Sequence, residues 1–333
     1  NTTGTANVAL GTNAMACNTT ASNNTAVGTN SLKLTTTGAA NTAVGYRAME
    51  DNTTGAANVA IGCAALVTNT TGCCNVAIGC ETLGANTTAN FITAVGARAL
   101  QTNTTGAGNT GLGYVALRAN TTGASNSAVG YNALGANTTG YSNIAVGFCA
   151  LDTNTTGNRN VAVGEGALEK QTTGVFNTGI GNRALCNITT GCNNIGIGVD
   201  AGTDELGSIT TGENQIVLGN HNHQNAFIKI DWTVTSDLRD KTEIKNVTHG
   251  LDFVNQITPI EYRFKKSRED ATPHGTKKYG FKAQEILELE GDNPVIINND
   301  DTDNLKLTSS HLIPVLVNAI KELKAEIELL KNK

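Results

Sequence analysis

Two short segments in the last third of the chain hold residue types that could do acid-base or nucleophilic chemistry. The first runs from Ser236 to Lys241 (Ser-Asp-Leu-Arg-Asp-Lys) and brings a hydroxyl, two carboxylates and two cations together within six residues. The second runs from Gly280 to Glu285 (Gly-Phe-Lys-Ala-Gln-Glu). Taken separately, each has an ordinary structural interpretation. Ser-Asp before a charged run is typical of a turn or helix cap, and the second segment is typical of the start of an amphipathic helix.

Together and in this order, the two segments closely resemble the intramolecular chaperone domain at the C-terminus of phage endosialidases, tailspikes and tail fibres. The Ser-Asp-x-Arg-x-Lys motif of that family is matched without a gap at Ser236, Asp237, Arg239 and Lys241, and its Gly-Phe-x-Ala-Gln-Glu segment is matched at 280–285. The likeness covers about residues 232–333.

The resemblance implies that this domain trimerises, guides folding of the fibre before it, and then cuts itself off on the N-terminal side of the motif serine. Carried onto this chain, the scissile bond is Thr235-Ser236, with Ser236 as nucleophile and Lys241 as general base. A lysine can act as a base only where burial lowers its pKa, so cleavage would wait until the trimer closes around it. A domain that trimerises without cutting is the alternative. The motif residues expected to be accessory are Asp237, Arg239, Gly280, Gln284 and Glu285.

His221 and His223 are the candidate metal ligands. In a trimer, one His-x-His per chain would place six imidazole nitrogens around a transition metal on the threefold axis, and imidazole suits iron, zinc or nickel. A polar loop of Asn and His is the simpler interpretation. No other cofactor is predicted.

The eight cysteines form no Cys-x-x-Cys metal pattern. Cys63 and Cys80 share a register in adjacent repeats, where stacked Cα atoms fall within disulfide range. Free, packed thiols are the default interpretation, and they would fit assembly in a reducing cytoplasm.

Most of the chain before these motif segments is a sequence repeat. Twelve glycines, from Gly11 and Gly28 to Gly198, recur at a constant interval of 17 residues. A fixed short repeat predicts a solenoid, and 17 residues are too few for two helices and a turn. We therefore expect a mainly β fold with a β-solenoid shaft over 1–220. It would hold twelve coils to about residue 204 and then an irregular coil, followed by a junction at 221–235.

Within a coil, Val59, Ala60 and Ile61 alternate as a short strand, with the two larger residues on one face and Ala60 on the other. Leu66 supplies a second apolar position. We expect Val59, Ile61 and Leu66 to form a thin core, while the small Ala60 and Ala65 make a face that another surface can approach closely.

The Asn at the position of Asn58 recurs in eleven of the twelve coils, and a Thr-Thr pair recurs in all twelve. Stacked Asn side chains can hydrogen-bond one another, so structural ladders are the simplest interpretation. Two others stay open. Threonine arrays can match ice, although the residue two places after each pair varies here. Asn-x-Thr triplets such as 18–20 accept glycans in a secretory pathway.

The repeats over 1–198 also resemble the head repeats of trimeric autotransporter adhesins, through their Asn-x-x-Ala-x-Gly-like strand, and repeats of this type occur in viral fibre proteins. The period of 17 residues is longer than the usual one. The resemblance implies a homotrimeric stalk or head built on a β-roll.

The segment 310–331 is expected to be a helix with a heptad seam. Its apolar residues alternate spacings of three and four, which favours a coiled coil over a lone surface helix. Ile at a with Leu at d favours two strands, but with fewer than three heptads the domain before the helix decides. The seam residues are Ile313, Leu316, Ile320, Leu323, Ile327 and Leu330.

The net charge of −5 over 333 residues is too mild to indicate nucleic acid as a partner. No stretch approaches about 18 apolar residues, so no membrane insertion is expected. We expect a homotrimeric viral or phage tail fibre or spike, assembled in the host cytoplasm and carried on the virion. It would contact other tail proteins and attach to a host receptor or glycan.

Residues 236–333 would form a small α+β chaperone domain and a single-turnover, self-cleaving serine endopeptidase with no other substrate. The alternative is a cell-surface adhesin or ice-binding β-solenoid with a non-cleaving trimerisation domain.

Overall fold

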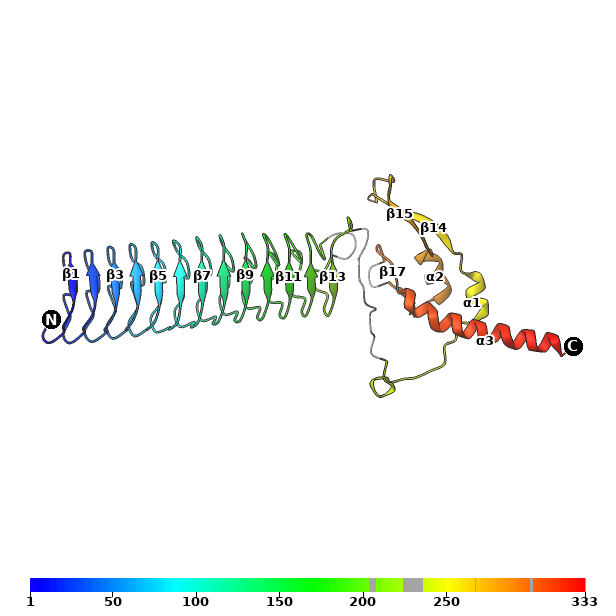
Figure 1. The fold of residues 1–333 in the computed structure, drawn as a ribbon, viewed down its shortest axis with the longest axis horizontal. Coiled ribbons are helices and arrows are strands. Elements are labelled where there is room, and N and C mark those ends of the chain that lie inside the picture. The colour runs from blue at the N-terminus through cyan, green and yellow to red at the C-terminus, as the bar shows by residue number, and fades with distance from the viewer. Residues whose placement is uncertain (204–207, 224–235, 267, 300–301, 333) are drawn as a thin grey trace. The chain divides into compact units, whose positions relative to one another are not determined.

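The computed structural model describes residues 1–203, 208–223, 236–266, 268–299 and 302–332, and the chain divides into two compact units, Asn1–Asn222 and His223–Lys333. The first unit, here called the shaft, is a parallel β-solenoid, as predicted (Figure 1). Its sheet has thirteen strands, each hydrogen-bonded to the strands before and after it in sequence. The strands are β1 (Val8–Leu10), β2 (Thr25–Val27), β3 (Thr42–Val44), β4 (Val59–Ile61), β5 (Val76–Ile78), β6 (Thr93–Val95), β7 (Thr110–Leu112), β8 (Ser127–Val129), β9 (Ile144–Val146), β10 (Val161–Val163), β11 (Thr178–Ile180), β12 (Ile195–Ile197) and β13 (Ile216–Leu218).

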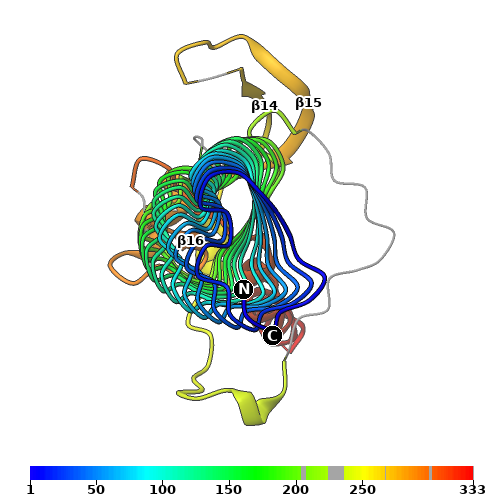
Figure 2. The same cartoon turned by 90° about the vertical axis from the view of Figure 1, so that its left-hand side faces the viewer.

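The strands of the shaft keep one register from end to end. Ala60 pairs with Ala77 of the next coil, and the same pairing of middle residues recurs along the sheet. The predicted irregular coil supplies β13, because Ile195 pairs with Ile216, 21 residues later. Viewed along the shaft, successive coils superpose in closely similar outlines (Figure 2).

The predicted assignment of the two strand faces is wrong. Ala60 and Leu66 are fully buried, whereas Ile61 is 40% exposed. The coil interior is narrow and the Leu side chains already fill it, so no space is left for a large side chain at the inward strand position. A Cβ added to Gly111, the equivalent of Ala60 three coils later, would lie 3.2 Å from Cδ1 of Leu100. The inward strand position therefore admits Ala or Gly in β1–β12, and the larger Val and Ile face outward.

The repeated glycines stand where adjacent coils approach closely. Gly130 has a φ of +132°, and a Cβ at this position would lie 2.4 Å from the carbonyl oxygen of Gly147 in the next coil. Both the backbone angle and the close contact require glycine. The 17-residue glycine interval of the sequence therefore marks one corner of every coil.

Buried asparagines form two ladders along the shaft, which confirms the structural interpretation of these repeats. In the first ladder, Asn75 N donates to Oδ1 of Asn58 at 2.9 Å, and Asn58 Nδ2 donates to the Gly72 carbonyl at 2.9 Å. In the second, Asn69 Nδ2 donates to Oδ1 of Asn52 at 2.9 Å. Asn52 and Asn69 belong to Asn-Thr-Thr triplets and are fully buried, so a glycan on them is incompatible with the folded coil.

The second unit is a small α+β domain, as predicted. Its buried core residues are Phe253, Ile286, Ile296, Ile297, Leu312 and Val315. Two antiparallel pairs, β14–β15 and β16–β17, accompany three helices. The elements are η1 (Leu238–Asp240), α1 (Leu251–Gln256), β14 (Ile260–Lys265), β15 (Pro273–Gly280), α2 (Ala283–Glu290), β16 (Ile297–Asn298), β17 (Lys306–Leu307), η2 (Ser309–His311) and α3 (Leu312–Lys331).

The C-terminal helix α3 packs on α1 through one face. Leu312, Val315 and Ala319 of α3 are buried. Within the described part of the chain, none of the helices has the length and apolar character needed to cross a membrane.

Candidate functional site

The segment from Ser236 to Lys241 folds as one tight turn. Asp237 caps the short 3-10 helix η1, because its Oδ1 accepts from the backbone N–H of Arg239 at 2.9 Å. The turn closes when the Lys241 N–H donates to the carbonyl of Leu238 at 3.2 Å. This closure carries the lysine side chain back toward the serine at the start of the segment.

The turn brings the predicted nucleophile and base together. Lys241 Nζ donates to Oγ of Ser236 at 2.9 Å. This is within the reach that proton transfer between a hydroxyl and a base requires. The other side of the predicted scissile bond, Thr235, lies outside the described residues.

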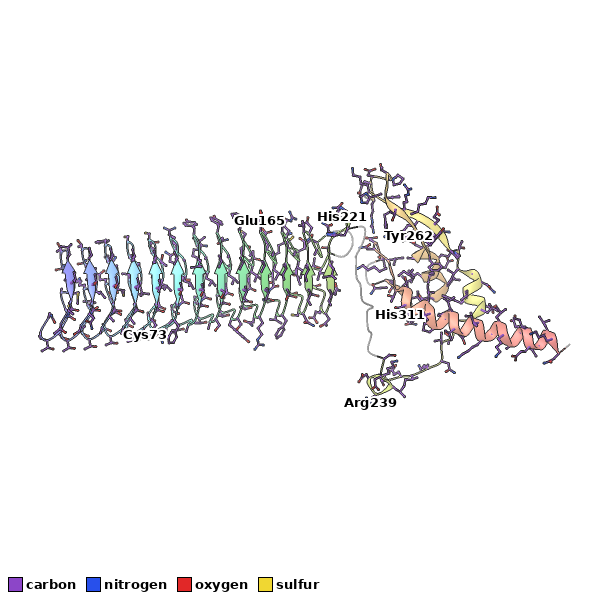
Figure 3. All side chains as sticks on the ribbon, viewed as in Figure 1. Cys73, Glu165, His221, Arg239, Tyr262 and His311 are labelled. Atoms are coloured by element: carbon purple, nitrogen blue, oxygen red, sulfur yellow. The ribbon has the colours of Figure 1, made fainter. Side chains whose placement is uncertain are left out.

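Asp237 and Arg239 form a bidentate ion pair across the same turn. Arg239 Nε lies 3.1 Å from Oδ1 of Asp237, and a terminal guanidinium nitrogen lies 2.5 Å from Oδ2 (Figure 3 labels Arg239). Hydrogen bonds from the Arg239 side chain and backbone lower the pKa of the Asp237 carboxyl. The pair contacts the turn rather than the serine hydroxyl, so the accessory role that we expect for it is to hold the geometry of the turn.

The site is open to water in a single chain. Ser236 and Lys241 are both exposed. Lys241 Nζ donates to the Ser236 hydroxyl here, whereas a general base accepts the proton of the nucleophile. To act as the base, Lys241 must accept the proton of Ser236, and burial is the physical means of favouring the neutral amine that this step requires.

The second motif segment forms a strand end and a helix start. Gly280 ends β15, where a Cβ would come within 2.9 Å of the Tyr262 ring, and α2 begins at Ala283. Glu285 Oε1 accepts from the Thr258 hydroxyl at 3.0 Å, while Gln284 is exposed. Among the described residues, no hydrogen bond or ion pair joins this segment to 236–241. The accessory roles of Gly280, Gln284 and Glu285 therefore stay predictions.

Two carboxylates that the sequence did not single out organise the C-terminal unit. Glu290 accepts from the backbone N–H groups of Val295, Ile296 and Ile297 at 2.7–3.0 Å, which fixes the start of β16. Glu322 of α3 accepts from the backbone N–H of Leu251 at 2.6 Å, at the start of α1. Partners 71 residues apart leave no local pattern that sequence reasoning could use.

The other chemical candidates are the two histidines at the sequence boundary of the two units and the cysteines of the shaft. His221 and His223 are exposed. A site made of one His-x-His per chain needs further copies, so the metal stays a prediction. All eight cysteines are free, and Cys63 and Cys80 lie exposed in adjacent coils. Although the residue as a whole is exposed, partial desolvation of the sulfur, reinforced by the neighbouring Cys63, raises the pKa of the Cys80 thiol. Such a shift makes the thiol less reactive.

Comparison with known protein families gives a match in the C-terminal unit. Residues 236–293 match the family model described as Chaperone of endosialidase. No curated protein matches the chain. The resemblance expected from the two motif segments is thus confirmed for the matched residues, and the match starts at Ser236, the residue whose hydroxyl contacts Lys241. From Ser236 to Asn293 the chain is similar to the chaperones of endosialidases, and this segment follows a β-solenoid.

Proposed function

We propose that this chain is the subunit of a homotrimeric viral or phage tail fibre or spike. Its C-terminal unit would align three copies, promote folding of the shaft, and then release itself by cutting the bond between Thr235 and Ser236. The observation that carries the proposal is the 2.9 Å contact between Lys241 Nζ and Ser236 Oγ, at the first residue of the matched segment.

The proposed reaction uses the residues of the turn. Oγ of Ser236 attacks the carbonyl carbon of Thr235, and its proton passes to Nζ of a deprotonated Lys241. The C–N bond breaks, and the amino group of Ser236 takes up a proton. The resulting ester between Thr235 and the serine hydroxyl is then hydrolysed by water, which releases the Thr235 carboxylate and restores the hydroxyl. Each chain carries out one turnover.

Trimer formation is supported by the unpartnered face of α3. The predicted seam residues lie away from the core of the unit, and Ile320 is 66% exposed. Leu316 and Leu323 on the same seam are 46% and 45% exposed. A row of Ile and Leu at heptad spacing is stabilised when the same row of another copy covers it. Three helices closing in this way would also exclude water from surfaces of the C-terminal unit.

The repeat explains why such an aid would be needed. Every coil of the shaft offers the same strand and corner, so copies that meet at random can be displaced by one coil with little loss of contact. Nucleating the copies at one end removes this ambiguity. Cutting afterwards would make the mature fibre kinetically stable, because unfolded chains could no longer realign.

Attachment to a host receptor or glycan, contacts with other tail proteins and a place on the virion belong to the same proposal. The supporting observations are the solenoid architecture and the matched segment. An ice-binding shaft finds less support, because the third residue of every strand is Val, Ile or Leu, so no two outward threonine columns stand one residue apart on the sheet.

The test is the intact mass of freshly expressed protein beside Ser236→Ala and Lys241→Ala, with Lys245→Ala as a matched control outside the turn. We expect wild type and the control to yield a fragment that begins at Ser236, and the first two variants to stay whole. A wild-type protein that stays whole as a trimer would make the C-terminal unit a permanent trimerisation domain. Cleavage that persists in Lys241→Ala would rule out Lys241 as the general base.

A further inference from the structure

The outward side of the shaft sheet is an apolar surface that runs the full length of the solenoid. We call it the strand face and define it as the first and third residues of each strand β1–β13. Figure 1 shows these strands in one row along the shaft. Since the middle residue of each strand points into the coil, the first and third residues point outward together.

The strand face contains no charged residue. The third residue is Val, Ile or Leu in every strand, and the first is Val, Ile, Thr or Ser. Val146 is 38% exposed and Ile197 43%, although each has in-register neighbours on both sides. Neighbours at strand spacing cover the flanks of these side chains, so the exposed part is the tips, which together form a continuous outward surface.

Aromatic side chains extend this surface along one edge. Tyr114, Tyr131 and Phe148 stand two residues after the ends of their strands and stack with ring centroids 5.7 and 5.0 Å apart. All three are exposed, as is every other aromatic residue of the shaft. Glu165, labelled in Figure 3, follows Phe148 in the same column and ends this row of stacked aromatic residues.

The strand face is large for a surface left open to water. Thirteen strands about 4.8 Å apart give a length of about 58 Å. With a width of about 10 Å the footprint is about 600 Å², at the upper end of the largest apolar patch on a typical monomer and close to the roughly 800 Å² that each partner gives to a standard interface. An uncharged surface of this size, with an apolar residue at the third position of every strand, indicates a surface that another molecule covers.

We propose that the strand face is the surface on which a second copy of this chain docks, side by side and in parallel. This inference rests on the proposed homotrimer and adds where the shafts touch. A partner for the face must offer an uncharged apolar strip of about 58 Å with the same 4.8 Å repeat. A second shaft meets both conditions, and rows of Val and Ile at equal spacing can interdigitate.

The two apolar surfaces of the chain would then have different tasks. The strand face supplies area but repeats at every coil, so it cannot select one register between copies. The seam of α3 occurs once per chain, so it can select the register and needs little area to do so. The C-terminal unit would set the register between the shafts, and the strand face would stabilise the shafts in that register.

The test is site-specific photo-crosslinking in the full chain carrying Ser236→Ala, which keeps the C-terminal unit attached. A benzophenone side chain replaces Val146 on the strand face or, as matched control, the exposed Thr139 of the same coil on another face. Val163 and Thr156 repeat the comparison one coil later. We expect covalently linked pairs of chains from positions 146 and 163, and at least tenfold less from 139 and 156.

The outcomes separate this inference from the proposed function. An assembly of three chains by light scattering, without links from 146 and 163, overturns the strand face as the contact and leaves the trimer standing. The face would then be covered by some other partner, such as a receptor. A mass of one chain overturns both the contact and the trimer, while self-cleavage is decided separately by the Ser236 and Lys241 variants.

Discussion

The shaft and the C-terminal unit satisfy their polar and apolar groups in different ways. In the shaft, the coil interior is filled by Leu and Ala, and buried Asn side chains bond to the next coil. In the C-terminal unit, the core is a small cluster around Phe253 and Ile286, while Ile320 and the Ser236–Lys241 pair are exposed. A repeat stacked on itself completes its own interior, whereas the C-terminal unit leaves an apolar helix face and the Ser236–Lys241 pair exposed.

This difference indicates how stability and activity should respond to change. The shaft gains its interior from nearest-neighbour coils, so damage to that interior should be local and should leave the number of chains in the assembly unchanged. The C-terminal unit would depend on association, so damage to its exposed groups should depend on concentration and alter cleavage.

The largest effect is expected from Ile320→Glu on the seam of α3. Three copies of this variant would bring carboxylates together at the centre of the helices, so we expect complete loss of assembly and of cleavage. Light scattering and intact mass check the result. Leu329→Glu, an equally exposed apolar position off the seam, should leave both unchanged. Full assembly of Ile320→Glu would show that the seam is not the contact.

A smaller loss is expected from Asp237→Ala, which removes the cap and the ion pair of the turn. Lys241 would then lose its fixed approach to Ser236, and a misplacement of about 1 Å slows a reaction by about 10²-fold. The rate of fragment release by intact mass checks this. Asp240→Ala, in the same turn, is the control. Equal rates for the two variants would show that the Asp237–Arg239 pair does not position the lysine.

Within the shaft, Asn120→Ala should destabilise the fold without affecting the chemistry. The Asn120 amide donates to Asn103 Oδ1 at 2.7 Å and to the Gly123 carbonyl at 2.9 Å, and its oxygen accepts from Asn137 at 2.7 Å. Leaving these buried partners unpaired costs about 1–3 kcal/mol of the free energy of unfolding. Chemical denaturation checks the loss, with the exposed Thr122→Ala as control. A change in the number of chains per assembly, measured by light scattering, would contradict a coil interior that is completed within one chain.

The smallest effect is expected from Asp152→Asn. Burial, and next the charge of Glu169 in the adjacent coil, raise the pKa of the Asp152 carboxyl, and its Oδ1 is buried without a partner. The folded state therefore holds the proton more tightly, so stability falls as pH rises above the ordinary value near 3.8. At pH 7 the variant should be more stable by less than about 1 kcal/mol.

Melting temperatures at several pH values check that prediction. The gain from Asp152→Asn should vanish below the ordinary carboxyl pKa, where the aspartate is protonated in both states. Glu169→Gln should give a change of the same sign, because it removes the repulsion. A gain that persists unchanged at low pH would point to a cause other than the charge.

Several features could be predicted from the residues in order. The glycine interval predicted the solenoid, and the displaced spacing near its end predicted the irregular coil that supplies β13. The match of the motif residues predicted the family likeness of the segment from Ser236. These features are local or strictly periodic, so each can be seen without knowing what packs against it.

Other features could not be predicted because they depend on distant contacts. The contact of Glu322 with the start of α1 joins residues far apart in the sequence. The exposure of Ser236 and Lys241 likewise depends on what covers the turn, which the motif itself does not state.

The sequence by itself determined the period of the shaft, the alternation within each strand and the spacing of serine and lysine in the turn. The tertiary structure alone decided which strand face points inward. Alternation places Ala60 and Ile61 on opposite faces of the strand whichever face points inward. The space inside the coil decides which of them points inward, because Leu66 and its equivalents already fill most of it. A narrow interior takes the smaller side chain, and the larger ones are left outside, where they form the strand face.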